Sequence, residues 1–187
     1  MPTGNLSSVG APEIRQAVHT DLPAMVRSLG QKAYFADRLT RQDAGHGLLL
    51  VAWERGMAVG DVYVWLGPAE EPELRVHLPG VALLTHLEVL PRRRNRGIGT
   101  ELLWSAEERL FAIGHEQVAL GVGLDNHDAR RLYQRRGYSE WPYGEVATTE
   151  VVYHPDGGHE LRPELCRIMV RQLREDHSEK HGDRHAG

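Results

Sequence analysis

One stretch of this sequence restricts the possible folds more than any other: an apolar segment that runs into a basic, glycine-containing turn and then into a helix. Val81 to Val89 is dense in leucine and valine until Pro91 interrupts it, which predicts a buried strand. From Ile98 onward, apolar residues recur at helical spacing until Gly114, which predicts a helix. The junction reads LEVLPRRRNRGIGTELL, residues 87–103.

This strand–turn–helix junction has the properties of an anion-binding site. The first N–H groups of a helix lack intrahelical partners and carry the positive end of the helix dipole, so a phosphate is a natural ligand there. Arg94 and Arg96 add guanidinium donors, and Gly97 and Gly99 carry no side chain that would block the approach. The pattern is neither Walker A nor the three-glycine dinucleotide fingerprint. A solvated basic edge or a small nucleic-acid contact is the alternative interpretation.

The remaining elements are expected on both sides of this junction. Thr20 and Asp21 are candidate caps for a helix, and Asp125 or Asn126 for another that ends at Gly137. The elements expected before the junction are a strand at 14–18, helices at 22–29 and 31–41, a hairpin of strands at 47–53 and 58–65, and a loop at 67–80. Those expected after it are a strand at 117–122, a helix at 126–136, interrupted strand pieces at 138–153, a loop at 155–165 and a last strand at 166–173.

The bulk composition favours one soluble domain. The chain has 187 residues and a formal net charge of −4, which argues against a broad nucleic-acid-binding surface. No run approaches the roughly 18 apolar residues of a membrane span, and we expect a cytoplasmic protein in a reducing compartment, because Cys166 is the only cysteine. We expect a flexible N-terminus at 1–12, one domain at 13–174 and a disordered tail at 175–187.

No metal site is predicted. His177, His181 and His185 are spaced by four residues, which on a helix could bind a metal, but the surrounding tail has no apolar face that would fold it.

Two motifs resemble the GNAT superfamily of acyl-coenzyme A-dependent N-acetyltransferases. Arg94-Asn95-Arg96-Gly97-Ile98-Gly99 is similar to that family's Arg/Gln-x-x-Gly-x-Gly/Ala motif, and Leu87-x-Val89-x-Pro91 precedes it as the family pattern requires. The segment Asn126 to Tyr133 and the following Arg136-Gly137-Tyr138 resemble the second half of the same cofactor site. The match extends over roughly residues 83–140.

The resemblance implies a mixed α/β (α+β) fold. Its central mixed, mostly antiparallel sheet would have about six to seven strands with a splayed parallel pair, flanked by about four helices. Acetyl-CoA would be the co-substrate, with its pantetheine arm on main-chain groups of one strand and its pyrophosphate on the turn. The implied cofactor-binding residues are Leu87, Val89, Arg94, Asn95, Arg96, Gly97, Ile98, Gly99, Thr100, Asn126 and Tyr133.

Catalysis needs a proton acceptor for the amine and a proton donor for the departing thiolate. The resemblance implies that Tyr133 is the acid, although an isolated helical tyrosine is commonly a core residue. Glu88 and then His86 are the candidate bases, with Thr85 as a water holder, and strict alternation places His86 and Glu88 on one face of the strand unless a bulge changes the phase. A base from another segment, a water chain or no dedicated base remain open.

These features predict an N-acetyltransferase that moves an acetyl group from acetyl-CoA to a primary amine, and we expect no nucleic-acid and no membrane partner. A small-molecule acceptor is favoured, and Glu70, Glu71 and Glu73 could attract a cationic one. The alternatives are a protein lysine or N-terminal acetyltransferase, a non-catalytic acyl-CoA sensor, and a nucleic-acid-binding protein that uses the Arg92–Arg96 run. A homodimer is compatible with all of them.

Overall fold

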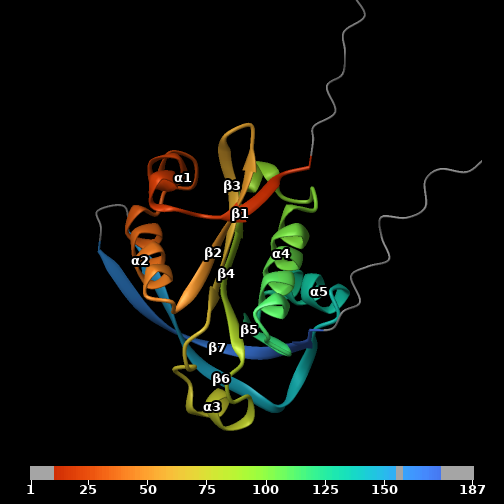
Figure 1. Ribbon diagram of the computed structural model, residues 1–187. Helices are drawn as coiled ribbons and strands as arrows, with labels where there is room; N and C mark the ends of the chain where they lie inside the picture. The colour runs from red at the N-terminus through yellow and green to blue at the C-terminus, as the bar shows by residue number, and fades with distance from the viewer. Residues whose placement is uncertain (1–10, 155–157, 174–187) are drawn as a thin grey trace, which may run out of the picture.

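The computed structural model describes residues 11–154 and 158–173, and it contains a seven-stranded sheet in the order β1-β2-β3-β4-β5-β7-β6 (Figure 1). The strands are β1 (Glu13–Gln16), β2 (Gly47–Glu54), β3 (Met57–Trp65), β4 (Ala82–Val89), β5 (Gln117–Gly123), β6 (Ser139–Tyr153) and β7 (His159–Gln172). The helices are α1 (Leu22–Leu29), α2 (Lys32–Asp43), α3 (Pro72–His77), α4 (Ile98–Ala112) and α5 (His127–Arg135). The predicted mixed fold is confirmed. The histidine-rich tail and most of the expected flexible N-terminus lie outside the described residues.

Helices α1 and α2 cover one face of the N-terminal half of the sheet (Figure 1). Their buried Met25 and Phe35 pack against the inward-facing Leu49 and Tyr63 of the β2–β3 hairpin. The hairpin turns through Arg55 and Gly56, both at positive φ (50° and 77°), which is the geometry of a tight turn that matches the twist of antiparallel strands.

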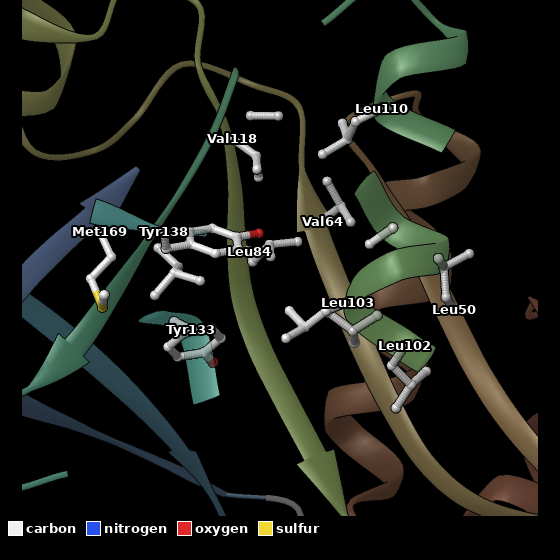
Figure 2. Close-up of a cluster of buried hydrophobic side chains, with 14 of the residues drawn as sticks. Leu50, Val64, Leu84, Leu102, Leu103, Leu110, Val118, Tyr133, Tyr138 and Met169 are labelled. Carbon is white, nitrogen blue, oxygen red and sulfur yellow. The ribbon is translucent and has the colours of Figure 1, made fainter. Parts of the chain in front are cut away.

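Helix α4 covers the opposite face and packs on a separate cluster of buried side chains (Figure 2). Leu102, Leu103 and Leu110 recur along one side of the helix, as the helical spacing predicted. Tyr133 of α5 and Tyr138, which follows that helix, close the same cluster. The sheet therefore separates two apolar layers. Strand β4 contributes Ala82 and Leu84 to the α4 layer, and its Leu83 belongs to a third cluster.

The parallel pair β4–β5 is short. Ala82, Leu83 and Leu84 pair with residues 118–120, and the pairing ends there. Beyond Leu84, β4 continues along β3, whereas β5 continues along β7 as far as Gly123. The two strands thus splay apart from Thr85 onward, as the predicted fold requires.

Two expected loops are instead ordered elements. Helix α3 interrupts the predicted loop at 67–80, because Pro72 suits the start of a helix and Leu74 is buried in a third cluster with Leu83 and Trp141. Strand β7 begins at His159, inside the predicted loop at 155–165, where its side chains are mostly exposed and give no alternating pattern. Main-chain pairing with β6 extends the strand there, and β6 itself is one strand with a register shift between Glu140 and Glu145.

None of the helices among residues 11–154 and 158–173 is long and apolar enough to cross a membrane.

Candidate active site

A bulge in β4 sets the orientation of the predicted catalytic side chains. Tyr63 pairs with His86 while the next β3 residue, Val64, pairs with Leu84, so Thr85 is the extra residue on β4. Past the bulge, Leu87 and Val89 pack toward the α4 cluster. His86 and Glu88 share the other face, as predicted, and Thr85 does not follow the simple alternation.

His86 lies between two carboxylates. Its Nε2 atom is 3.5 Å from Oδ2 of Asp61 on β3 and 3.6 Å from Oε2 of Glu88. The Asp61 side chain is only 1% exposed, and the hydroxyl of Tyr34 donates to it over 3.4 Å. The Tyr34 and His86 rings also contact each other, with their centroids 4.6 Å apart. The His86 side chain remains 27% exposed, so this interior cluster reaches the surface.

Gln31 holds the other end of the cluster. It lies between α1 and α2 with φ of 50°, a left-handed backbone conformation that is uncommon for residues other than glycine. Its side-chain amide donates to Oε2 of Glu88 over 2.8 Å, across 57 positions of sequence. The helix expected from Gln31 therefore begins one residue later, at Lys32. Gln31 itself links the α1–α2 connection to β4 through its hydrogen bond with Glu88.

The surroundings shift the pKa values of Asp61, His86 and Glu88. Burial raises the pKa of Asp61 to about 6, although the charge of His86 opposes that rise. Burial alone would lower the pKa of His86, but the interactions with Glu88 and Asp61 outweigh it and raise the value above 6.5. The interaction with His86 and the hydrogen bond from Gln31 lower the pKa of Glu88. Glu88 is therefore a weaker proton acceptor than an ordinary glutamate, and His86 is a stronger one than an ordinary histidine.

The basic turn lies at the end of β4 and leads directly into α4. Asn95 and Gly97 have positive φ values of 60° and 82°, and Ile98 is the first helical residue. A Cβ atom at Gly97 would meet no atom within 4 Å, so the backbone conformation accounts for glycine at this position. Arg94 donates through Nε to the main-chain oxygen of Val89 over 3.0 Å, which anchors its guanidinium beside the turn.

The second predicted motif forms α5 and its start. The side-chain oxygen of Asn126 accepts a hydrogen bond from the main-chain N–H of Ala129 (3.1 Å), so Asn126 caps this helix. Its contact with a coenzyme stays a prediction. Tyr133 is 9% exposed, and burial raises its pKa to about 12. This phenol is protonated at neutral pH.

Strand β4 therefore divides the predicted site residues into two groups. Leu87, Val89, Gly99 and Tyr133 lie toward α4 and α5, where a Cβ atom at Gly99 would come 3.8 Å from Val89 and 3.9 Å from Leu132. His86 and Glu88 lie toward α1 and α2. The members of both groups that β4 contributes lie beyond Leu84, where β4 no longer pairs with β5.

Sequence reasoning missed Asp61, Tyr34 and Gln31. Asp61 did carry a signal, because it is the only charged residue in the strand MAVGDVYVW and such a residue needs a partner when the strand is buried. Its partner depends on the bulged register with β4, which sequence does not show. Within the described residues, no group of three or more metal-binding side chains comes together.

Comparisons with known proteins agree with this geometry. Residues 12–138 match the Acetyltransferase (GNAT) family. Aminoalkylphosphonate N-acetyltransferase of Salmonella typhimurium is 36% identical over 64 residues, which make up 34% of this chain and 42% of that enzyme. The match thus spans less than half of the length of that relative.

Two solved structures share the fold. Ribosomal-protein-S18-alanine N-acetyltransferase of Escherichia coli superposes with a TM-score of 0.60 at 19% identity, covering 91% of this chain and 99% of that one. PaiA N-acetyltransferase of Thermoplasma acidophilum, in complex with coenzyme A, superposes with a TM-score of 0.58 at 16% identity. The match covers 87% of this chain and 99% of that one. Because the family match extends over residues 12–138, well over half of the sequence, the chain belongs to the GNAT family of acetyltransferases and is an acyl-coenzyme A N-acyltransferase.

Proposed function

We propose that this enzyme transfers an acetyl group from acetyl-CoA to the primary amine of a small molecule, by direct attack in a ternary complex. The observation that carries this proposal is the position of His86 between Asp61 and Glu88, on the strand where β4 and β5 splay. The coenzyme would enter from the α4–α5 side and the amine from the α1–α2 side, so the two substrates would meet at the splay.

The turn would hold the coenzyme. The N–H groups at the start of α4 and the guanidinium groups of Arg94 and Arg96 suit a pyrophosphate, and main-chain groups of Leu87 and Val89 would bond the pantetheine arm. The Asn95, Gly97, Ile98, Gly99 and Thr100 backbone forms the rest of this cradle. That PaiA N-acetyltransferase, which has the same fold, binds coenzyme A supports this assignment.

We assign the role of proton acceptor to His86. Two carboxylates face Nε2, which favours the tautomer with the proton on that nitrogen and leaves the lone pair on Nδ1. Nδ1 then accepts a proton from the ammonium group of the acceptor, which leaves the neutral amine that attacks the thioester, and Asp61 and Glu88 stabilise the imidazolium that forms. Glu88, first in the order predicted from sequence, serves as a positioning residue here because its own pKa is lowered.

Tyr133 would return a proton to the thiolate of coenzyme A. Its raised pKa keeps the phenol protonated, as a general acid must be before it acts. An N–H of the Leu87–Val89 segment, which β5 leaves unpaired past Leu84, would stabilise the oxyanion of the tetrahedral intermediate.

A small acceptor is favoured over a protein for two reasons. Tyr153 of the long β6–β7 hairpin packs 5.7 Å from Tyr34, between ring centroids, and so narrows the α2 side of the cluster. The Salmonella relative is named for a small amine, the aminoalkylphosphonates. The second candidate is a protein N-terminus, because the fold is shared with a ribosomal-protein-alanine acetyltransferase. A cytosolic setting fits the single cysteine, Cys166, which is free and buried.

The decisive experiment combines calorimetry with a turnover assay. Acetyl-CoA should bind the purified protein, and Gly99→Trp should abolish binding because the large side chain would fill the start of the cradle. Thiol release should then occur with small primary amines and exceed that with peptides that bear a free N-terminus. Absence of acetyl-CoA binding by the unaltered protein would refute the proposal, and binding without turnover on any amine would leave only an acyl-CoA sensor.

A further inference from the structure

The hairpin of β6 and β7 exposes large apolar side chains that the proposed acetyl transfer does not use. Val151 is 37% exposed, Leu165 44% and Leu161 60%. Val151 pairs directly with Leu161, and Ala147 pairs with Leu165. Residues that pair across antiparallel strands project to the same face, and so do residues two apart along one strand. These four residues therefore share one face of the hairpin, which we call the apolar hairpin face.

The opposite face of the same hairpin is polar. There Glu150 pairs with Arg162, and Thr148 pairs with Glu164. Arg162 also donates through Nε to Oε1 of Glu160 over 3.0 Å. An antiparallel sheet separates apolar from charged residues in this way when one of its faces covers an apolar surface and the other faces water. The apolar hairpin face therefore has the pattern of a surface that covers something.

One end of the apolar hairpin face lies at the start of α5. Arg167 follows Leu165 by two residues and so lies on the same face of β7. It donates through Nη1 to the main-chain oxygen of Leu124 over 3.1 Å, just before Asn126 caps α5. Figure 1 shows the hairpin extending from there to the side of α2.

The other end reaches the candidate base. Tyr153 follows Val151 by two residues on the same face, and its ring lies 5.7 Å from that of Tyr34. Tyr34 in turn lies 4.6 Å from the ring of His86. Starting from Tyr153, Val151 and its partner Leu161 continue the apolar hairpin face about 7 Å farther along the hairpin. The face is thus continuous with the cluster that surrounds His86.

We propose that the apolar hairpin face binds the body of the amine acceptor, so that the preferred substrates are primary amines with an extended alkyl or aryl body. This inference rests on the proposed acetyl transfer and specifies its substrate class. The amine would lie at His86, and the body would pass Tyr153 and cover Val151 and Leu161, which removes apolar surface from water on both sides. Short amines would end at Tyr153, so longer ones should be better substrates.

The test uses propylamine, hexylamine and decylamine, which are straight-chain primary amines that differ only in the length of the apolar body. The value of kcat/KM for each amine is measured with the unaltered enzyme, with Leu161→Gln and with Ile113→Gln. Ile113 is the matched control, because it is an apolar residue of similar exposure (57%) that lies between α4 and the start of β5. The apolar hairpin face lies past Gly123, at the other end of β5.

We expect kcat/KM to increase about 10-fold or more from propylamine to decylamine in the unaltered enzyme. Full burial of a methylene group contributes about fourfold, and burial against an open face contributes less. Leu161→Gln should lower the ratio of decylamine to propylamine about threefold or more, because it places an amide where the apolar body would lie. Ile113→Gln should preserve this ratio, and Leu161→Met, which keeps the apolar surface, should also preserve it.

Several results would overturn the proposal. One is a kcat/KM that does not increase with chain length in the unaltered enzyme, and another is an equal loss of the ratio in Leu161→Gln and Ile113→Gln. A dimer in analytical ultracentrifugation that Leu161→Gln dissociates, with the ratio unchanged, would assign the face to a second copy of the chain. Faster acetylation of peptides with apolar N-terminal residues than of decylamine would assign it to a protein acceptor.

Failure of the proposed transfer remains distinguishable. If no amine is acetylated, calorimetric titration with decylamine in the presence of coenzyme A still tests the apolar hairpin face. Binding that Leu161→Gln weakens and Ile113→Gln retains would support the inference, and absence of binding would refute it.

Discussion

Oδ2 of Asp61 lies 3.5 Å from Nε2 of His86, although the two residues are on different strands and Asp61 is almost completely buried. A buried carboxylate beside an imidazole stabilises the imidazolium and fixes which ring nitrogen carries the proton. Asp61 thereby links the packing of the β3–β4 pair to the protonation of the candidate base, and its effect should be visible in the pH dependence of the reaction.

We expect kcat/KM to rise with pH through a pKa above 6.5, as His86 loses its proton. Asp61 and Glu88 raise this pKa, while burial and the charge of Arg38 lower it. Asp61→Asn removes a negative charge, so the imidazolium loses its proton more readily and the rising limb should move to lower pH. The pH–rate profile of the variant measures this shift. Asp43→Asn removes a charge from an exposed residue and should leave the limb in place; an unchanged limb in Asp61→Asn would contradict the role of Asp61.

The order of the two candidate bases can be decided by neutral replacements. His86→Gln should lower kcat by about 10²- to 10⁴-fold, the usual contribution of a general base, with little change in the dissociation constant of acetyl-CoA. Glu88→Gln should lower kcat less and should also shift the rising limb to lower pH. A larger loss of kcat in Glu88→Gln than in His86→Gln would reverse the assignment.

Tyr133→Phe keeps the buried ring and removes the hydroxyl, so it should lower kcat by about 10²-fold while the free energy of unfolding changes little. Steady-state kinetics and urea unfolding measure the two effects. Tyr138→Phe is the matched control, because Tyr138 is a buried tyrosine of the same cluster whose hydroxyl bonds Glu107. It should alter stability more than turnover, and a full-rate Tyr133→Phe would exclude Tyr133 as the acid.

Glu107 should be the most sensitive charged position for stability. It is 1% exposed and accepts from Arg136 and Arg171 at 2.7 Å each and from Tyr138 at 3.0 Å, so it joins α4 to the end of α5 and to β7. Glu107→Ala leaves two partly buried cations without their carboxylate, which should cost about 3–5 kcal/mol of unfolding free energy. Urea unfolding measures the loss. Glu108→Ala, at the neighbouring exposed position, is the control and should lower the unfolding free energy by about 0.5 kcal/mol or less.

The parts of the fold that sequence predicted are those with local signals. The turn and α4 were predictable because Pro91, Gly97 and the spacing of Leu102 and Leu110 all act within one stretch of chain. The start of β7 was not, because residues from His159 onward are exposed and are extended only by pairing with β6. Helix α3 is short, and burial of Leu74 under a distant cluster stabilises it.

In the candidate site, too, sequence predicted the residues that lie together in the chain and missed those that come from separate elements. Both motifs of the coenzyme side are contiguous in sequence, so the resemblance identified them. The acceptor side assembles Gln31, Asp61 and His86 from three separate elements, and their meeting depends on a left-handed residue and a bulge. Neither irregularity follows from periodicity, because each inserts an exception into an otherwise regular pattern.

The short pairing of β4 with β5 also affects the order in which the protein can fold. Only three residue pairs join these strands, whereas β5 pairs along its full length with β7, which is contributed by residues 159–172. The earlier strands can form their hairpins as soon as they are synthesised, but β5 gains its main partner only when β7 is available. Closing contacts between distant segments is slow because of the entropy of the intervening chain. We therefore expect docking of β7 to limit the folding rate, and β5 to acquire protection from hydrogen exchange later than the β2–β3 hairpin.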